Sequence, residues 1–548
     1  MKWFSSFVLT TASILLTIRP TIAAEFIIVP LGKTTISISL DSLERYGNLG
    51  EINPQEPLAT YLELLNPEQR QSLRTLLQTR YTLPDISIQQ FVNSPLLMTF
   101  LTHVGTIIKT QSEENGADAI RTSLIQVGDA PNGFTILEIM RQFPSPEIRL
   151  NVERTLATLT KVFALIRQTQ AVTHSLEALS KVEAQKAPMT NFSKLPDLRQ
   201  LGKFNLGIKQ TITVNYSQKN RQFQADIYRP EANSSVLQNS SQLSYPVIVI
   251  SHGLASNRSR FEPLAKHLTS YGFVVVVPQH PGSDYQQFQS LLKGEAKDLF
   301  EPEEFVERPR DITELLNHLE TLNTTEFNQQ LNLQNVGVIG HSLGGYTALT
   351  LAGATLNFTQ LKSDCQQLDI PLNPSLFLQC RALELPQENY SLQDPRVKAI
   401  FILNPVNSSL LGQSGLSRIK IPVFITASTD DFLAPALLEQ LNAFTWLTTP
   451  DKYLVLQNHA THFYDITSEN ASELLGNSAV IVPTSETTRT YIKALSTAFF
   501  KTYLNQDSQY KSYLHAAYTQ TISDPVYPIS LIQSLTPNQL KNAINQEN

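Results

Sequence analysis

The sequence predicts an α/β fold, in which a mostly parallel sheet is covered by helices on both faces, preceded by a separate, mainly helical domain. Apolar runs such as 247–250 and 274–277 are continuous, as expected of central parallel strands that are buried on both faces. Helical patterns alternate with such runs from about residue 204 onward, which is typical of a parallel sheet. Before residue 176, leucines recur mainly at helical spacing.

The chain begins with an apolar segment that has the features of a secretory signal peptide. Lys2 gives an early positive charge, an apolar run covers 4–18, and small residues follow at Ala23 and Ala24. Cleavage after either alanine fits equally well. The run is short for a membrane span, which needs about 20 residues. We therefore expect residues 1–24 to be removed, the mature protein to be periplasmic or extracellular, and no transmembrane segment in the mature chain.

Residues 25–175 are expected to form the helical N-terminal domain. Asn66, Ser94 and Ser145 are each followed by proline, which is the pattern of a helix start. The last of these is expected to begin a long helix that runs through Ile166. No catalytic residue types cluster in this domain. We expect it to pack against, cover or target the catalytic domain, and its sequence indicates no particular protein partner.

The remaining boundaries follow from changes in the pattern. A chain of 548 residues is too long for one ordinary core, so at least two domains are expected. Residues 176–203 lose the helical periodicity and are interrupted by prolines, which predicts a linker. Residues 204–520 are expected to form the α/β catalytic domain, and residues 521–548 a peripheral C-terminal tail.

The composition is that of a globular protein. The chain is 41% hydrophobic and 16% charged, and its net charge of −6 is small for this length. Because it has no basic run, we expect no nucleic-acid partner.

The two cysteines, Cys365 and Cys380, fall in one segment. Export would place them in an oxidising compartment, so they are candidates for a disulfide, which would stabilise the fold by about 3 kcal/mol. The alternative is two unrelated buried thiols.

The candidate nucleophile is Ser342. Residues 336–339 form a short apolar run, residues 340–344 have the pattern G-x-S-x-G, and residues 345–352 predict a buried helix. A serine hydroxyl is a weak nucleophile, so it must stand clear of the backbone where a histidine can take its proton. Strand, G-x-S-x-G turn and helix together form the nucleophile elbow of an α/β-hydrolase.

The order nucleophile, acid, base directs the search for the carboxylate. After the expected strand 423–426, Asp430 and Asp431 stand side by side on a turn. We choose Asp431 because it lies four residues before Pro435, which matches the D-x-x-x-P pattern of hydrolase turns. Asp430 is kept as the alternate.

The base is sought after the expected strand 453–456. His459 and His462 both lie in the loop that follows it. We choose His462, because its neighbour Phe463 gives a resemblance to the histidine loop of related hydrolases, and keep His459 as the alternate. A metal site here is disfavoured since no carboxylate stands at ligand spacing. We expect neither a metal nor a cofactor.

An oxyanion hole is expected from two backbone N–H groups, those of Leu254 and Leu343. The turn 251–254 follows the first central parallel strand, where this fold places its second donor. His252 on this turn is expected to be structural. His341 is not expected to be the base, because its position next to Ser342 directs its side chain away.

Two insertions are expected to shape the substrate pocket: one follows residues 279–284 and runs to about Pro309, and the other runs from about Asn357 to Asp394. The apolar residues of the second would suit an acyl or lipid-like group, or the packing of a lid against the domain.

From Pro246 to about His462 the sequence resembles the hydrolases grouped with platelet-activating-factor acetylhydrolase and dienelactone hydrolase. The resemblance lies in 250–254, in 340–345 and in the loops of Asp431 and His462. It implies the α/β-hydrolase fold and serine-dependent hydrolysis of a small-molecule or lipid ester. It does not imply the acetylhydrolase substrate, and dienelactone hydrolases proper have cysteine where this chain has serine.

Residues 25–175 resemble, more weakly, the helical domain of unknown function that is fused to such hydrolases in cyanobacteria. Short phrases such as 76–80 and 142–144 carry this similarity. It implies an exported cyanobacterial protein. An acyltransferase with the same triad and a non-catalytic binding protein on the same fold stay open as alternatives.

Overall fold

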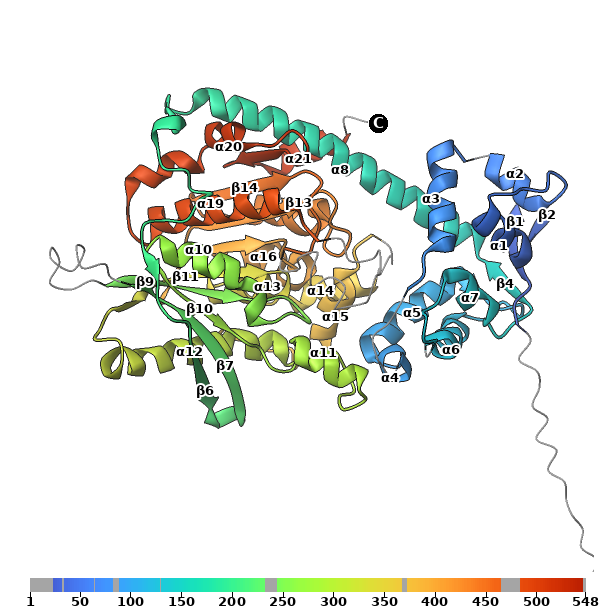
Figure 1. The fold of residues 1–548 in the computed structure, drawn as a ribbon, viewed down its shortest axis with the longest axis horizontal. Coiled ribbons are helices and arrows are strands. Elements are labelled where there is room, and N and C mark those ends of the chain that lie inside the picture. The colour runs from blue at the N-terminus through green and yellow to red at the C-terminus, as the bar shows by residue number, and fades with distance from the viewer. Residues whose placement is uncertain are drawn as a thin grey trace, which may run out of the picture.

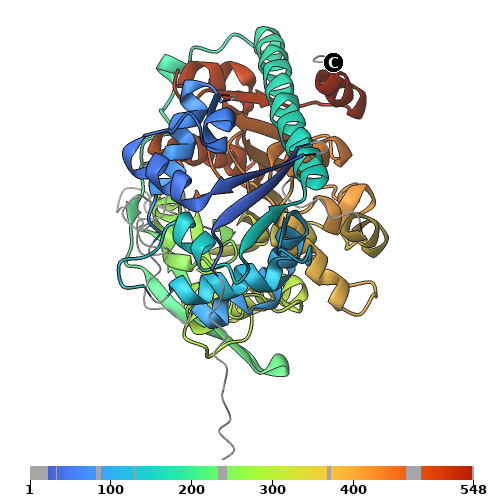
Figure 2. The same ribbon diagram turned by 90° about the vertical axis from the view of Figure 1, so that its right-hand side faces the viewer.

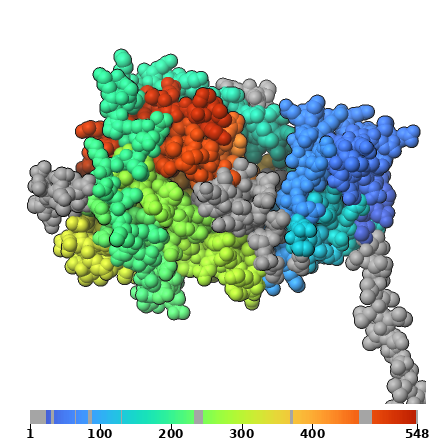
Figure 3. Space-filling view, viewed as in Figure 1, coloured from blue at the N-terminus to red at the C-terminus, as the bar shows by residue number. Residues whose placement is uncertain are grey.

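The computed structural model describes residues 23–31, 34–63, 65–81, 88–128, 130–231, 244–366, 372–464 and 483–545. A large C-terminal part is built on a nine-stranded sheet, and a smaller N-terminal part packs at one end of it (Figures 1 and 3). The expected signal peptide lies outside the described residues, apart from its last two.

The central sheet confirms the predicted α/β-hydrolase fold. Its strand order is β15-β14-β13-β12-β11-β9-β10-β7-β6. The six strands from β14 to β10 run parallel, and antiparallel strands close both edges. In chain order the strands are β6 (Gln210–Tyr216), β7 (Arg221–Tyr228), β9 (Tyr245–Ser251), β10 (Val274–Pro278), β11 (Leu331–His341), β12 (Val397–Leu403), β13 (Val423–Ser428), β14 (Lys452–Gln457) and β15 (Ile529–Ile532).

Both faces of this sheet are buried, which explains the continuous apolar runs. Side chains alternate between faces along a strand: Val247 and Val249 of β9 join one core, and Ile248 and Ile250 join the other. The first core is covered by α12 (Glu304–Thr325), α13 (Leu343–Leu351), α16 (Ser408–Leu416), α17 (Asn442–Trp446) and α21 (Pro537–Asn545). The second is covered by α10 (Glu262–Ser270), α19 (Glu486–Tyr503) and α20 (Ala516–Ile522).

His267 on α10 gives this packing a measurable pH dependence. Its pKa is lowered from 6.5 to about 4, first because burial penalises the charged ring and then because Lys493 is near. The unfolded chain therefore binds a proton below about pH 6.5 that the folded protein excludes, so stability falls as the pH is lowered. Between pH 7.5 and 5, we expect the free energy of urea unfolding to fall by about 2 kcal/mol more for the wild type than for His267→Leu. Equal losses in both proteins would contradict this.

The N-terminal part combines helices with a small sheet of order β2-β1-β4-β3. Its strands are β1 (Phe26–Leu31), β2 (Thr34–Ser39), β3 (Ile108–Lys109) and β4 (Glu147–Leu150). Its helices are α1 (Leu40–Leu49), α2 (Pro57–Glu63), α3 (Pro67–Gln78), α4 (Ile88–Val92), α5 (Pro95–Ile107), α6 (Ala117–Gly128), α7 (Ile136–Arg141) and α8 (Val152–Lys186).

The helix start expected at Ser145 is wrong. Residues 147–150 alternate between polar and apolar side chains, form β4 and pair with β1, with Ile148 buried. The long helix begins six residues later, where Asn151 caps α8 by accepting the N–H of Arg154.

Two of the expected boundaries are also wrong. The first part of the linker 176–203 is helical, because α8 continues to Lys186 and packs Leu176 into the core beneath it. The tail 521–548 is not peripheral, because β15 is an edge strand of the central sheet and α21 covers one face. A four-residue strand is too short for its apolar pattern to be recognised. Although α8 has 35 residues, no helix among the described residues is long and apolar enough to span a membrane.

The N-terminal part, which faces the viewer in Figure 2, contacts both insertions of the catalytic part. On α4, the ring of Phe91 lies 6.2 Å from that of Phe288 on α11 (Tyr285–Leu292), in the first insertion. On α5, the ring of Phe100 lies 5.8 Å from that of Phe377 on α15 (Ser375–Cys380), in the second insertion. The two parts therefore meet through the segments that follow β10 and β11 as well as along α8, which packs on α20, α21 and β15.

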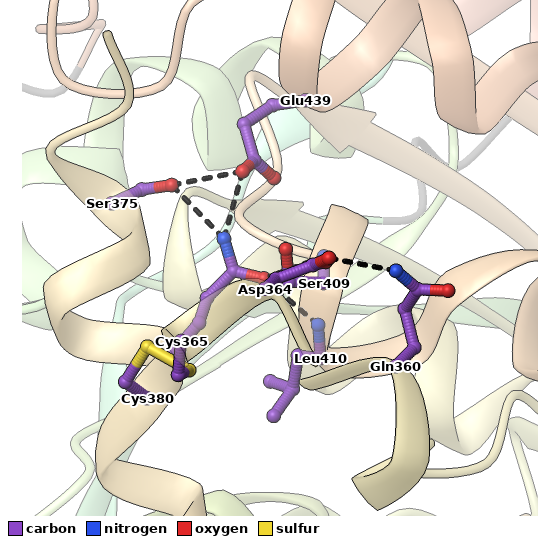
Figure 4. The surroundings of a disulfide bond; sticks show 9 residues. Gln360, Asp364, Cys365, Ser375, Cys380, Ser409, Leu410 and Glu439 are labelled. Carbon is purple, nitrogen blue, oxygen red and sulfur yellow. Dashed lines mark hydrogen bonds between the residues drawn. A yellow bond between two sulfur atoms is a disulfide. The ribbon is translucent and has the colours of Figure 1, made fainter. Parts of the chain in front are cut away.

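A disulfide and a set of hydrogen bonds stabilise the second insertion. Cys365 at the end of α14 (Phe358–Gln366) forms a disulfide with Cys380 of α15 (Figure 4). Beside it, the buried carboxylate of Glu439 accepts hydrogen bonds from Ser375 and Gln379 of α15, at 3.0 and 2.7 Å. These bonds hold α15 against the segment after β13.

Candidate active site

Ser342 stands on a sharp turn between β11 and α13, with φ +54° and ψ −117°, a conformation that L-residues rarely adopt. The glycines around it make this turn possible. A Cβ atom on Gly340 would lie 2.0 Å from the carbonyl oxygen of Gly344, and one on Gly344 would lie 2.0 Å from the carbonyl oxygen of Ser251. The strand and helix therefore approach more closely than any larger residue allows, and the serine projects from the turn.

Three of the predicted residues form one hydrogen-bonded chain. Ser342 Oγ lies 2.9 Å from His462 Nε2, and His462 Nδ1 lies 2.7 Å from Asp431 Oδ2. All three side chains are buried. A carboxylate at Nδ1 keeps the proton on that nitrogen, which leaves Nε2 free to accept the proton of the serine.

The Asp431 carboxylate is fixed by three further hydrogen bonds. Its Oδ1 accepts the backbone N–H groups of Leu433, at 3.0 Å, and Ala434, at 2.8 Å. Its Oδ2 also accepts the side-chain amide of Asn404, at 2.6 Å. Asn404 is not among the residues predicted from the sequence, although a polar residue directly after the buried strand β12 is a usable signal.

The alternates Asp430 and His459 lie outside this chain. Their side chains are 53% and 65% exposed, and Asp430 Oδ2 lies 3.7 Å from His459 Nδ1. They face each other at the surface. The neighbour of the nucleophile, His341, donates through Nε2 to the main-chain carbonyl of His462 at 2.8 Å. It supports the loop of the candidate base.

Both predicted oxyanion donors lie beside the nucleophile. Leu343 is the first residue of α13, so its N–H has no acceptor within the helix. The turn that carries Leu254 passes close by, because a Cβ atom on Gly253 would lie 3.3 Å from Ser342 Cβ.

His252 fixes the orientation of the second donor. Its Nε2 accepts the N–H of His280 at 3.1 Å, so its Nδ1 donates to the carbonyl oxygen of Gly253 at 2.8 Å. The C=O and N–H of one trans peptide point in opposite directions. Holding the Gly253 carbonyl therefore also holds the N–H of Leu254.

A second Ser-His-Asp chain lies behind this turn. His280 Nδ1 is 3.0 Å from Asp311 Oδ2, and His280 Nε2 is 3.0 Å from Ser251 Oγ. All three are completely buried, so a substrate has no access to them. Burial, followed by the charges of Arg308 and Arg221, lowers the pKa of His280 well below 6.5, so the ring is neutral. Burial raises the pKa of Asp311 to about 6, against the opposing effect of Arg221.

This buried chain holds the backbone of His280, whose N–H orients His252. This chain is not predicted from the sequence, because its members come from three separate elements and share no motif. His252 is therefore a positioning residue for the oxyanion turn.

We expect His252→Ala to lower kcat by up to about 10²-fold with little change in KM, because loss of an oxyanion donor affects the transition state and not the bound ester. Steady-state kinetics with a soluble short-chain ester measure both constants. A rise in KM with unchanged kcat would contradict this role.

The sheet order and the arrangement at the elbow define the α/β-hydrolase fold. Two family models match the chain. Residues 23–151 match the family described as an alpha/beta hydrolase of unknown function (DUF1400), and residues 203–368 match the chlorophyllase family. No curated protein matches significantly.

The chlorophyllase match includes Ser342 and the turn 251–254 but ends before Asp431 and His462. Together the matches support a hydrolase. Neither model is that of the acetylhydrolase group, so that finer resemblance stays a prediction.

Proposed function

We propose that the protein is a serine-dependent hydrolase of carboxylic esters that acts through an acyl-enzyme on Ser342. The observation that supports this most is the hydrogen-bonded chain from Ser342 through His462 to Asp431, at a strand-to-helix turn beside two candidate oxyanion donors. The sequence resemblance to the acetylhydrolase and dienelactone hydrolase group favours an ester as the substrate.

In the first half of the reaction, Ser342 Oγ attacks the ester carbonyl carbon while His462 Nε2 takes the hydroxyl proton. The carbonyl oxygen becomes an oxyanion that accepts hydrogen bonds from the N–H groups of Leu254 and Leu343. When the tetrahedral intermediate collapses, His462 gives its proton to the leaving alkoxy oxygen, the alcohol departs, and the acyl group stays on Ser342. Asp431 stabilises the imidazolium and remains ionised.

In the second half, His462 takes a proton from a water molecule, whose oxygen attacks the acyl carbonyl. Collapse of this second intermediate releases the carboxylic acid and returns the proton to Ser342 Oγ. The net reaction consumes one water and one ester and yields one acid and one alcohol.

An ester panel tests this proposal. The mature protein should hydrolyse p-nitrophenyl butyrate, and water should remain the main acyl acceptor when a competing alcohol is added. Dominant formation of a new ester would make the protein an acyltransferase. Binding of an ester without turnover would make it a binding protein and would overturn the proposal.

We also infer that the mature protein is exported. The apolar segment at 4–18 and the disulfide between Cys365 and Cys380 support this, because disulfides persist in oxidising compartments. N-terminal sequencing of the protein recovered from periplasmic and culture fractions measures it. A cytoplasmic protein that retains residues 1–24 would contradict it.

A further inference from the structure

A groove of about 610 Å³ lies between α8 and the loops that follow β13 and β14. Its size is within the range of ligand pockets, roughly 300–1,000 Å³. One wall is formed by Val162, Leu165, Ile166 and Thr169 of α8. The facing wall is formed by Leu372 of the second insertion, by Phe432, Pro435 and Ala436 after β13, and by polar residues of the same two loops, Thr429, Asp430, Asp431, Asn458 and His459. The N-terminal part and the catalytic part therefore each contribute one wall of the groove.

The groove adjoins the candidate catalytic residues. Asp431 itself contributes to its lining. The ring of Phe432 lies 6.5 Å from that of Phe463, which in turn lies 5.9 Å from the imidazole of His462. These two aromatic rings therefore connect the wall of the groove with the candidate base.

One end of the groove is apolar and the other is polar. Ile166 and Phe432 are 47% and 50% exposed, although both are large and apolar. On α8 the exposed apolar face continues away from the groove, at a spacing of three or four residues, through Phe163, Leu159 and Leu156. At the polar end, Asn458 donates to Glu177 of α8 at 2.9 Å. Contiguous exposed apolar surface of this kind marks a binding site more often than ordinary solvent-facing surface.

We propose that this groove binds the apolar chain of the ester substrate, so that α8 selects esters with a long hydrocarbon chain. The proposal rests on the proposed ester hydrolysis and gives it a substrate class. A concave, two-walled groove suits a flexible chain, and its polar end suits water or a polar group at the far end of that chain. The chain belongs either to the acyl group or to the alcohol, and the substrates below distinguish these.

The test compares Ile166→Glu with Val182→Glu. Both replace an exposed aliphatic residue of α8 by glutamate, a good helix former, but Val182 does not line the groove. The substrates are p-nitrophenyl butyrate, p-nitrophenyl dodecanoate and dodecyl acetate, used as monomers. We expect Ile166→Glu to lower kcat/KM at least about tenfold for one or both dodecyl-chain esters and to change it by less than about twofold for the butyrate. Val182→Glu should leave all three values near the wild type.

The outcomes separate this proposal from the ester hydrolysis on which it rests. If the wild type does not hydrolyse the butyrate, the proposed function fails. If it does, but Ile166→Glu and Val182→Glu give the same ratio of long-chain to short-chain kcat/KM, the groove does not bind the chain and only this proposal is overturned. A loss with p-nitrophenyl dodecanoate places the acyl chain in the groove, and a loss with dodecyl acetate places the alcohol chain there.

Discussion

Replacing His462 by alanine is expected to lower kcat for p-nitrophenyl butyrate by about 10⁶-fold, whereas His459→Ala should change it by less than about threefold. His462 Nε2 lies 2.9 Å from Ser342 Oγ, which is within hydrogen-bonding reach of the serine hydroxyl. Without the imidazole, the serine keeps its proton and the leaving alcohol receives none. His459 is largely exposed and pairs with Asp430, so its loss leaves this chain intact.

The two histidine variants control for each other, because they remove the same side chain from the same loop. Unchanged far-ultraviolet circular dichroism and melting temperature would show that both proteins remain folded. If the two variants lost activity equally, or if His459→Ala lost more, the base would have to be reassigned.

Asp431→Asn is expected to lower kcat by about 10⁴-fold, as replacing the orienting carboxylate does in serine proteases. The physical reason lies in the donors that surround the carboxylate. The Nδ1–H of His462 and the side-chain amide of Asn404 both donate to Asp431 Oδ2. The NH₂ group of an asparagine at this position would face these two donors instead of accepting from them. The imidazole would then lose its hydrogen-bond acceptor, and its proton would no longer be held on Nδ1.

Asp430→Asn is the matched control, with an expected change in kcat below about threefold, because its carboxylate is outside the chain and half exposed. The ratio of kcat for the two variants, measured with p-nitrophenyl butyrate from pH 6 to 9, checks the assignment. Similar kcat values for both variants would show that Asp431 does not orient the base.

Much of the candidate site can be predicted from the sequence, because the elbow depends on neighbouring residues and the acid and base follow it in a fixed order. The elbow needs small residues at 340 and 344, because a Cβ atom at either position would clash with backbone atoms. The two glycines therefore make the motif recognisable in the sequence. The acid and base then follow in a fixed order after buried strands. The choice between the adjacent residues Asp430 and Asp431 depended on a turn pattern. Of these two, Asp431 is the one that lies within hydrogen-bonding distance of His462.

The supporting residues could not be predicted in the same way. His280 and Asp311 act through contacts between distant segments, and no spacing rule connects them, whereas Asn404 had its place directly after β12 as a signal. The position of the N-terminal part could not be predicted for the same reason, because it depends on contacts between distant segments. Glu177 and Asn458, for example, form a hydrogen bond although they are 281 positions apart in the sequence. The apolar stripe of α8 indicated a helix, but a stripe does not reveal which surface it faces. The small sheet was overlooked because two of its strands have four residues or fewer.

The proposed ester hydrolysis requires Ser342 to be a reactive nucleophile. Labelling with a serine-reactive phosphonate, followed by peptide mass spectrometry of the folded protein, measures this directly. We expect one phosphonate per chain, attached to Ser342, and no labelling of Ser342→Ala or of the heat-denatured protein. An unlabelled native protein, or a label on another residue such as the buried Ser251, would contradict it.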